Sequence, residues 1–447
     1  MKAGFISLGC SKNLIDTEVM LGLLEKAGIE VSPEPAEADI LIVNTCAFIE
    51  SAKEEAITTV LSMAEYKNKG VGKCRALIVA GCLSQRYGQQ LLDEMPEADA
   101  VIGTGSCDRI MEAVEEVLSG RRVIIVGEDK LLYTAETPRI VTTAPYTAYL
   151  KIAEGCNNRC AFCAIPLIRG QLRSRPIEDI VEEAKRLVDS GVREIILLAQ
   201  DTASYGKDRY GEPKLAALLK ELCKIEKLDW VRTLYSYPRF FNDELIETIA
   251  SEPKIVKYVD LPLQHGDDTV LRNMRRPDTN EGMRSLIKKL REKIPGVCIR
   301  STFIVGFPGE TEEQYQTLRK FVEDMRFDKL GVFTYSREED TPAYDMPDQV
   351  EEAVMEDRYH DLMALQSKIS EETNQSLIGK EFTVLVEGRD VDDDGQEKNV
   401  VYGRSYREAP DVDGSVYVEG DEDSKPGDII SVRAAAGFAY DVVTERI

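Results

Sequence analysis

Three cysteines stand within eight residues, at Cys156, Cys160 and Cys163, and this C-x3-C-x2-C segment constrains the fold more than any other part of the chain. Three thiolates can hold three irons of a four-iron cluster and leave the fourth iron open to a ligand. The alternative is a structural zinc site, but zinc normally takes a fourth Cys or His, and the only histidines are His265 and His360. The spacing therefore favours a [4Fe-4S] cluster with an open iron.

The N-terminal part, residues 1–127, alternates short apolar runs with amphipathic segments, which predicts an open, mostly parallel α/β sheet. The expected strands are 2–8, 39–44, 75–80, 98–102 and 123–126. The expected helices are 14–27, 51–66, 85–92 and 108–118.

Three of these strands end in a cysteine, at Cys10, Cys46 and Cys82. Open α/β sheets place ligands at the carboxyl ends of their strands, so the three thiols are expected to converge on one edge and to bind a second cluster. The small residues before them, Gly9, Thr45 and Gly81, would let the backbone approach an inorganic cofactor. Cys107 also follows a strand but is left outside the predicted site, and the remaining cysteines are expected to pack in the core: Cys74, Cys223 and Cys298.

After an extended linker at 128–145, residues 146–378 predict a second α/β region. The expected strands are 147–153, 194–199, 231–235, 258–263, 298–305 and 329–335, and the expected helices are 176–190, 214–227, 243–251, 281–293 and 311–325. Six strand-helix units are too few for a complete eight-stranded barrel, so we expect a partial (β/α)6 barrel open along one side.

The C-x3-C-x2-C spacing resembles that of radical S-adenosylmethionine (radical SAM) enzymes, in which the open iron takes the amino and carboxylate groups of the cofactor. Polar or glycine residues at the strand ends are suited to bind the rest of S-adenosylmethionine through charge-assisted hydrogen bonds and close backbone approach. The candidates are Gln200, Asp201, Gln264, Arg300 and Gly306.

The C-terminal part begins with an amphipathic segment, 349–377, that is expected to pack as a helix across the barrel. Five short β-rich runs separated by Gly and Asp follow, at 382–386, 399–404, 415–418, 429–435 and 438–443. They predict a small all-β barrel over 379–447. Residues 380–447 contain 17 acidic and 8 basic residues, a net charge of −9, which is unlike a nucleic-acid-binding module.

The whole chain carries 56 basic and 80 acidic residues, a net charge of −24. Such a field repels phosphate polyanions and attracts basic partners. No segment reads as a secretory signal or a membrane span, so we expect a cytoplasmic protein with reduced thiols that works as a monomer without membrane contact.

Three further segments extend the resemblance to the methylthiotransferase family over the whole chain. They are Gly-Cys-Ser-Lys-Asn-Leu-Ile-Asp-Thr-Glu at 9–18, Leu-Gln-His-Gly-Asp-Asp at 263–268 with Met-Arg-Arg at 274–276, and Phe-Ile-Val-Gly-Phe-Pro-Gly-Glu-Thr at 303–311. The resemblance implies an N-terminal domain with a cluster on Cys10, Cys46 and Cys82, a radical SAM domain with a cluster on the Cys156 loop, and a C-terminal TRAM domain.

The tRNA-modifying relatives usually have Gln-Met-Asn after the first cysteine, whereas this chain has Ser11, Lys12 and Asn13, which favours the protein-modifying branch. That branch implies transfer of a methylthio group, by way of a 5′-deoxyadenosyl radical, to the β-carbon of an aspartate on the small-subunit ribosomal protein at the decoding centre. It also implies an electron donor and a sulfur donor. Two alternatives stay open: a tRNA adenosine methylthiotransferase, and a non-catalytic iron-sulfur or zinc scaffold.

Overall fold

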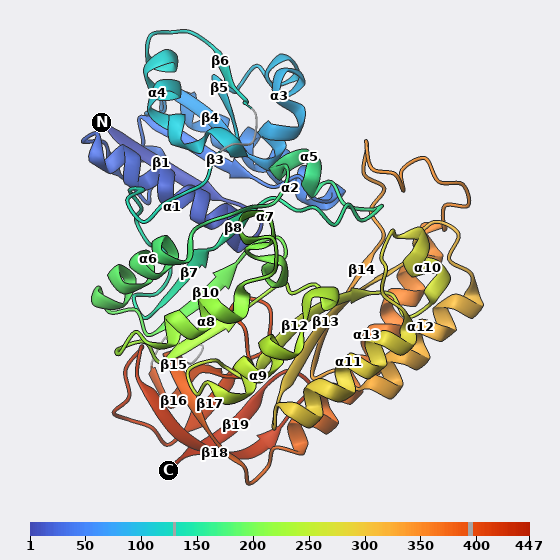
Figure 1. Cartoon of the computed structure of the whole chain (residues 1–447). Coiled ribbons are helices and arrows are strands. Elements are labelled where there is room, and N and C mark those ends of the chain that lie inside the picture. Colours follow the sequence, from blue (N-terminus) through green and yellow to red (C-terminus); the bar gives the residue numbers. More distant parts are fainter. Residues whose placement is uncertain (128–130, 392–396) are drawn as a thin grey trace.

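The computed structural model describes residues 1–127, 131–391 and 397–447 and shows three parts along one long axis (Figure 1). An N-terminal sheet with its helices lies at one end, a curved central α/β region lies in the middle, and a small β-barrel lies at the other end. This α/β fold class with a terminal all-β barrel agrees with the sequence prediction.

The N-terminal sheet has six parallel strands in the order β2-β1-β3-β4-β5-β6. Its strands are β1 Lys2–Ser7, β2 Glu30–Val31, β3 Ile40–Thr45, β4 Ala76–Gly81, β5 Ala100–Gly103 and β6 Val123–Ile125. Four helices cover it: α1 Ser11–Lys26, α2 Glu50–Ala64, α3 Cys82–Glu94 and α4 Ile110–Leu118. The two-residue strand β2 was not predicted from the sequence, since it is very short and both of its residues are exposed.

The two faces of this sheet bury alternate residues of the same strands, as the period of two in a strand requires. Leu41 and Val43 of β3 face α2 and α3, whereas Ile40 and Ile42 face α1 and α4. Because both faces are covered, β3 and β4 are buried along their full length, which explains their continuous apolar sequence.

The central region contains the six predicted strands, which pair as two parallel sheets of three, β11-β10-β7 and β12-β13-β14. Their bounds are β7 Thr147–Lys151, β10 Glu194–Leu198, β11 Trp230–Thr233, β12 Tyr258–Gln264, β13 Cys298–Val305 and β14 Lys329–Thr334. An isolated bridge between Val231 and Ile255 and a hydrogen bond from Ser236 N to the Asp260 carbonyl at 3.0 Å link the two sheets, so the partial barrel is continuous but irregularly paired at its centre.

Helices alternate with these strands and form the outer layer (Figure 1). They are α6 Ile177–Asp189, α7 Lys207–Tyr210, α8 Leu215–Cys223, α9 Asp243–Ser251, α10 Asp268–Asn273, α11 Asn280–Lys293 and α12 Glu312–Met325. The short helix α5, Ile165–Arg169, packs instead against the N-terminal part. A small antiparallel pair, β8 Ala153–Glu154 with β9 Arg173–Ser174, flanks the cysteine loop.

The C-terminal part forms a closed barrel in the order β15-β16-β17-β19-β18. Its strands are β15 Glu381–Val391, β16 Glu397–Ser405, β17 Val416–Glu419, β18 Ile429–Gly437 and β19 Val442–Arg446, and the long helix α13, Glu352–Gln375, precedes it. The last strand begins at Val442, four residues later than its apolar sequence suggested, because Phe438 and Tyr440 are exposed in the turn before it.

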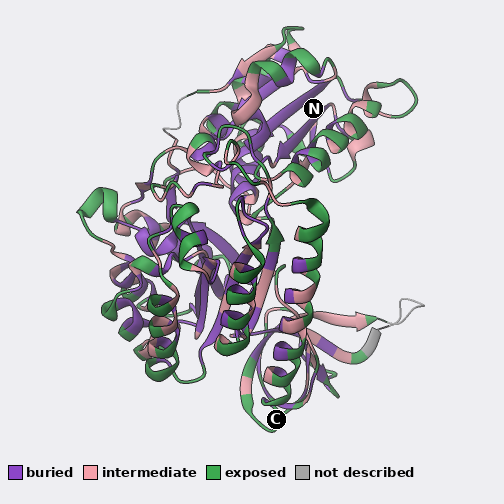
Figure 2. Cartoon of the chain, turned by 90° about the vertical axis from the view of Figure 1, so that its right-hand side faces the viewer, coloured by how far each residue is buried: buried purple, intermediate pink, exposed green. Residues whose placement is uncertain are grey.

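Buried ion pairs join the barrel to the central region. Arg404 of β16 and Arg232 of β11 both contact Glu194, at 2.7 and 2.9 Å. All three side chains are buried. Figure 2 shows that the strands are mostly buried, while much of the outer surface of the helices is exposed. Among the described residues, no helix has the length and apolar character needed to cross a membrane.

Candidate metal centre

The N-terminal thiols lie where three neighbouring strands end. Cys10 is the N-cap residue of α1, Cys82 is the first residue of α3, and Cys46 directly follows β3. Two of the three cysteines thus sit at helix amino ends, where the helix dipole favours a thiolate. The structure therefore brings the strand-end cysteines to one edge of the sheet.

The glycines before these cysteines are required by contact between the strand ends. A Cβ atom on Gly9 would lie 2.7 Å from Cys46 Cβ, and one on Gly81 would lie 2.3 Å from Asn44 Oδ1. Both glycines also have positive φ, +84° and +95°, which L side chains rarely adopt. They bring the thiols together, a different reason from the cofactor contact that the sequence suggested.

The side chains of Asn13 and Asn44 fix the same edge through hydrogen bonds to backbone carbonyls. Asn13 Nδ2 donates to the carbonyls of Leu8 and Thr45, and Asn44 Nδ2 donates to the Asn13 carbonyl at 2.7 Å. The start of α1 is thereby tied to the ends of β1 and β3.

Arg169, the last residue of α5, supplies positive charge to this cysteine group. Its Nη2 atom donates to Cys82 Sγ at 3.6 Å, and its charge also acts on Cys10 and Cys46. Burial raises the pKa of the Cys82 thiol to about 12 despite Arg169. Burial likewise raises the pKa of Cys46.

Cys10 differs from its two neighbours because it is exposed to solvent, although protein atoms crowd its sulfur. That crowding favours the neutral thiol, but the charges of Lys12 and Arg169, with backbone N–H groups, outweigh it and lower the pKa of Cys10. Of the three N-terminal thiols, Cys10 therefore loses its proton most readily, and the thiolate is the form that binds a metal.

The second cysteine group lies on the loop after β8. This loop is held by Cys156 N, which donates to the Gly170 carbonyl at 3.1 Å, and by Ala161 N, which donates to Met274 O at 2.9 Å. Arg276 Nη1 approaches Cys160 Sγ at 3.9 Å. Burial raises the pKa of Cys156 to about 11 and also raises the pKa of Cys160 and Cys163, so cluster binding must release protons.

Both groups offer three sulfur donors with a guanidinium group beside them, Arg169 in one and Arg276 in the other, which suits three irons of an anionic four-iron cluster. Within 1–127, 131–391 and 397–447, no three His, Cys, Asp or Glu side chains meet closely enough to hold a single metal ion.

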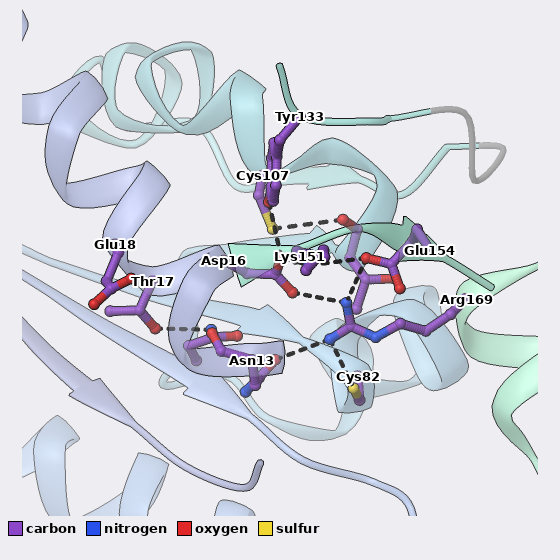
Figure 3. Close-up of polar contacts among 12 residues, drawn as sticks. Asn13, Asp16, Thr17, Glu18, Cys82, Cys107, Tyr133, Lys151, Glu154 and Arg169 are labelled. Carbon is purple, nitrogen blue, oxygen red and sulfur yellow. Dashed lines mark hydrogen bonds and ion pairs between the residues drawn. The ribbon is translucent and has the colours of Figure 1, made fainter. Parts of the chain in front are cut away.

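A buried polar network connects Cys82 and α1 to Lys151 and Glu154 of the central region (Figure 3). Asp16 of α1 contacts Lys151 at 2.6 Å and Arg169 at 2.8 Å, and Glu154 contacts the same two cations at 2.8 and 3.2 Å. Cys107 lies beside this network under Tyr133. Because α5 follows the Cys156 loop directly, the network places Cys82 against the central region.

A second bridge runs through the loop after β11. Lys12 Nζ lies 3.2 Å from the centroid of the Tyr235 ring, and Arg276 lies 4.1 Å from that of Tyr237. Lys12 is two residues from Cys10, and Arg276 contacts Cys160. Two residues of one loop thus contact cations that belong to different cysteine groups.

The predicted cofactor contacts have varied surroundings. Gln200 donates to Glu154 at 2.5 Å, while its Oε1 atom is buried without a hydrogen bond among the described residues. Asp201 accepts from Asn158 and from Tyr237 N, so it positions both loops. Gln264 ends β12 with φ +75°.

The other two predicted contacts have structural partners of their own. Arg300 pairs with Asp260 and with Asp413 of the C-terminal part. A Cβ atom on Gly306 would lie 2.1 Å from Met355 Cγ, so this glycine allows α13 to pack against the barrel.

Sequence patterns match in all three parts of the chain. Residues 150–322 match the radical SAM superfamily, residues 378–447 match the TRAM domain, and residues 2–103 match the uncharacterized protein family UPF0004. The ribosomal protein uS12 methylthiotransferase RimO of Desulforamulus reducens is 51% identical over 99% of this chain and 98% of its own length. RimO of Heliobacterium modesticaldum is 50% identical over 100% of this chain and 95% of its own.

The chain belongs to the RimO family of radical SAM methylthiotransferases. Its fold also resembles that of the radical S-adenosylmethionine methyltransferase TsrM from Kitasatospora setae, with a TM-score of 0.57 and 14% identity over 76% of each chain. Membership of the RimO family agrees with the resemblance that the sequence motifs indicated. Sequence reasoning missed the roles of Arg169 and Asn13 beside the N-terminal cysteines, because neither side chain is a usual ligand of an iron-sulfur cluster.

Proposed function

We propose that this chain inserts a methylthio group at the β-carbon of an aspartate in ribosomal protein uS12. The relatives named above carry uS12 methylthiotransferase in their names. The observation that carries the proposal is the contact of Arg169 with Cys82, because it sets the strand-end thiols beside the helix that follows the radical SAM cysteine loop.

The chemistry of the target explains why such a site is needed. An aspartate β-carbon has no acidic proton, so a general base of ordinary pKa cannot remove one at a useful rate. Removal of a hydrogen atom avoids this barrier. The site must therefore generate a radical and also hold a sulfur group nearby.

Cys10, Cys46 and Cys82 would hold an auxiliary [4Fe-4S] cluster, and Cys156, Cys160 and Cys163 would hold the second. When bound, the second cluster would supply the electron that cleaves S-adenosylmethionine for hydrogen-atom removal, and the auxiliary cluster would hold the sulfur, whose methyl group would come from a first molecule of S-adenosylmethionine. An external electron donor and an external sulfur donor complete the reaction.

The protein's own residues position these groups and exclude water. Asp201 ties the Cys156 loop, through Asn158, to the loop after β11. Arg169 and Arg276 each place one cation against a cysteine group, which favours thiolates over thiols. Gln200, with its free Oε1 atom, and Gln264 at the end of β12 are the proposed contacts to S-adenosylmethionine.

The charge of the chain suits a basic ribosomal protein, since complementary charge speeds and orients an encounter. Not every acidic residue of the C-terminal part is available for this. Glu408 pairs with Lys329, and Asp421 pairs with Arg446. Docking would use the remaining acidic surface.

The test is to incubate the reconstituted enzyme with small ribosomal subunits, S-adenosylmethionine and dithionite, and to map the products by mass spectrometry. The proposal expects a methylthio group in place of one hydrogen on a single uS12 aspartate. The same modification on tRNA adenosine, with uS12 unchanged, would replace the proposal with a tRNA-directed function.

A further inference from the structure

Lys12 is a buried cation that pairs with no carboxylate among the described residues. It lies in the first turn of α1 and is 7% exposed. Among the described residues its Nζ atom makes neither a hydrogen bond nor an ion pair, and its one close polar contact is the face of the Tyr235 ring. A buried ammonium group without an anion is costly, and a cation–π contact offsets only part of that cost.

The other cations at this junction are already matched. Arg169 and Lys151 share the carboxylates of Asp16 and Glu154, and Arg276 lies 3.3 Å from Asp278. Lys12 is therefore a charge that the fold leaves open to a ligand.

Tyr235, in the loop after β11 of the partial barrel, fixes the position of the Lys12 ammonium group. This residue has φ +60°, an uncommon conformation for a side chain other than glycine. Tyr235 N donates to Asp260 Oδ2 at 2.8 Å, and its carbonyl accepts from Thr202 N at 2.9 Å. Strained backbone positions held by several contacts are frequent at ligand sites. Here the strained backbone of Tyr235 places its ring face against the Lys12 ammonium group.

We propose that Lys12 binds the side-chain carboxylate of the target aspartate. This inference rests on the proposed function, since it assigns the group that recognises its substrate. The carbon to be modified is bonded directly to the carboxylate carbon. An aspartate whose β-carbon lies between the two cysteine groups therefore places its carboxylate close to both of them, and Lys12 lies there, beside Cys10 and against the barrel loop.

An anion is the ligand class that a lysine ammonium selects, through charge-assisted hydrogen bonds. S-adenosylmethionine also has a carboxylate, but in radical SAM enzymes that group is taken by the open iron of the cluster on the Cys156 loop. The ammonium group of Lys12, near Cys10, is therefore left to bind the carboxylate of the protein substrate.

The test compares two substrates and three enzymes. The substrates are purified uS12 and uS12 with asparagine at the modified aspartate. The enzymes are the reconstituted wild type, Lys12→Met, which removes the charge at similar length, and Lys12→Arg, which keeps the charge. Affinity is measured by isothermal titration calorimetry without reductant, so the result does not depend on turnover.

The wild type should bind the aspartate form roughly 10- to 100-fold more tightly than the asparagine form, the range expected for a partly buried charge pair. Lys12→Met should lower this ratio to about one, whereas Lys12→Arg should keep most of it. Iron content and the electron paramagnetic resonance spectra of both clusters serve as the check that the variants are intact.

If Lys12→Met keeps the wild-type preference for aspartate, the proposal is wrong. It is equally wrong if the variant shifts the reduction potential of the auxiliary cluster while the preference stays the same, because Lys12 would then serve only the thiolates. A wild-type enzyme that modifies no uS12 aspartate at all would instead reject the proposed function.

Discussion

The guanidinium of Arg169 donates a hydrogen bond to the sulfur of Cys82 at 3.6 Å, although the two residues belong to different parts of the chain. Arg169 ends α5, just after the radical SAM cysteines, and Cys82 begins α3 of the N-terminal sheet. This contact, within the buried network of Figure 3, makes the assembly of the two cysteine groups part of the folded core.

Replacing Arg169 with methionine should destabilise the protein strongly. The change removes one of the two cations that pair with the buried carboxylates of Asp16 and Glu154. The free energy of unfolding should therefore fall by about 3–5 kcal/mol. The melting temperature of the cluster-free protein should fall by several degrees, as measured by circular dichroism. Arg109→Met is the matched control, because its pair with Glu112 is exposed, and it should leave the melting temperature nearly unchanged.

The thiols of the N-terminal group should differ in reactivity when no cluster is bound. The pKa of Cys10 is lowered by Lys12 and Arg169 against the effect of burial, and Cys10 is exposed, whereas burial raises the pKa of Cys82 to about 12. At neutral pH iodoacetamide should therefore modify Cys10 well before Cys82, as followed by peptide mass mapping. Equal rates at the two positions would contradict the described charge distribution.

Substitution of Gly81 by alanine should disturb the auxiliary site selectively. The added Cβ would clash with Asn44 and Thr45, and φ is +95°. Gly28→Ala is the control: its φ is +79°, but no atom lies within 4 Å of the added Cβ, so only about 1 kcal/mol of backbone strain is expected. Iron analysis should show loss of the N-terminal cluster in Gly81→Ala and retention in Gly28→Ala.

Docking of the C-terminal barrel should weaken in acid through Glu194. Burial opposes ionisation of this carboxyl, but Arg404 and Arg232 lower its pKa from 4.5 to about 2. The stabilisation is therefore fully present above pH 4.5, the unfolded value, and is lost as the pH falls toward 2. Its size is about 3 kcal/mol at neutral pH.

The variant Glu194→Gln tests this dependence. It should melt at least about 5 °C below the wild type at pH 7, and the difference should shrink between pH 5 and pH 3. A difference that is independent of pH would show that the carboxylate charge contributes nothing to docking.

Much of this architecture follows from local sequence patterns. The buried strands β3 and β4 are continuous apolar runs, and the positions of Cys46 and Cys82 at their ends follow from chain direction alone. The strands of the central partial barrel were likewise predictable, because the alternation of strands and helices can be read from local sequence patterns.

What the sequence could not provide are contacts between distant segments. Arg169 looks like a surface arginine at a helix end until the fold places Asp16 and Cys82 beside it. Gly306 stays a predicted cofactor contact, and its close approach to Met355 of a later helix could not be read from the sequence. Lys12 appeared only as part of a family motif, and its contact with Tyr235 requires the tertiary structure.

The most direct measurement is iron content in four reconstituted proteins: the wild type, the Cys10/Cys46/Cys82→Ala triple variant, the Cys156/Cys160/Cys163→Ala triple variant and the combination of both. The two-cluster account predicts about eight irons, about four, about four and none. It also predicts that the N-terminal triple variant still cleaves S-adenosylmethionine but forms no methylthio product. An N-terminal triple variant that keeps about eight irons, or that still modifies uS12, would contradict the account.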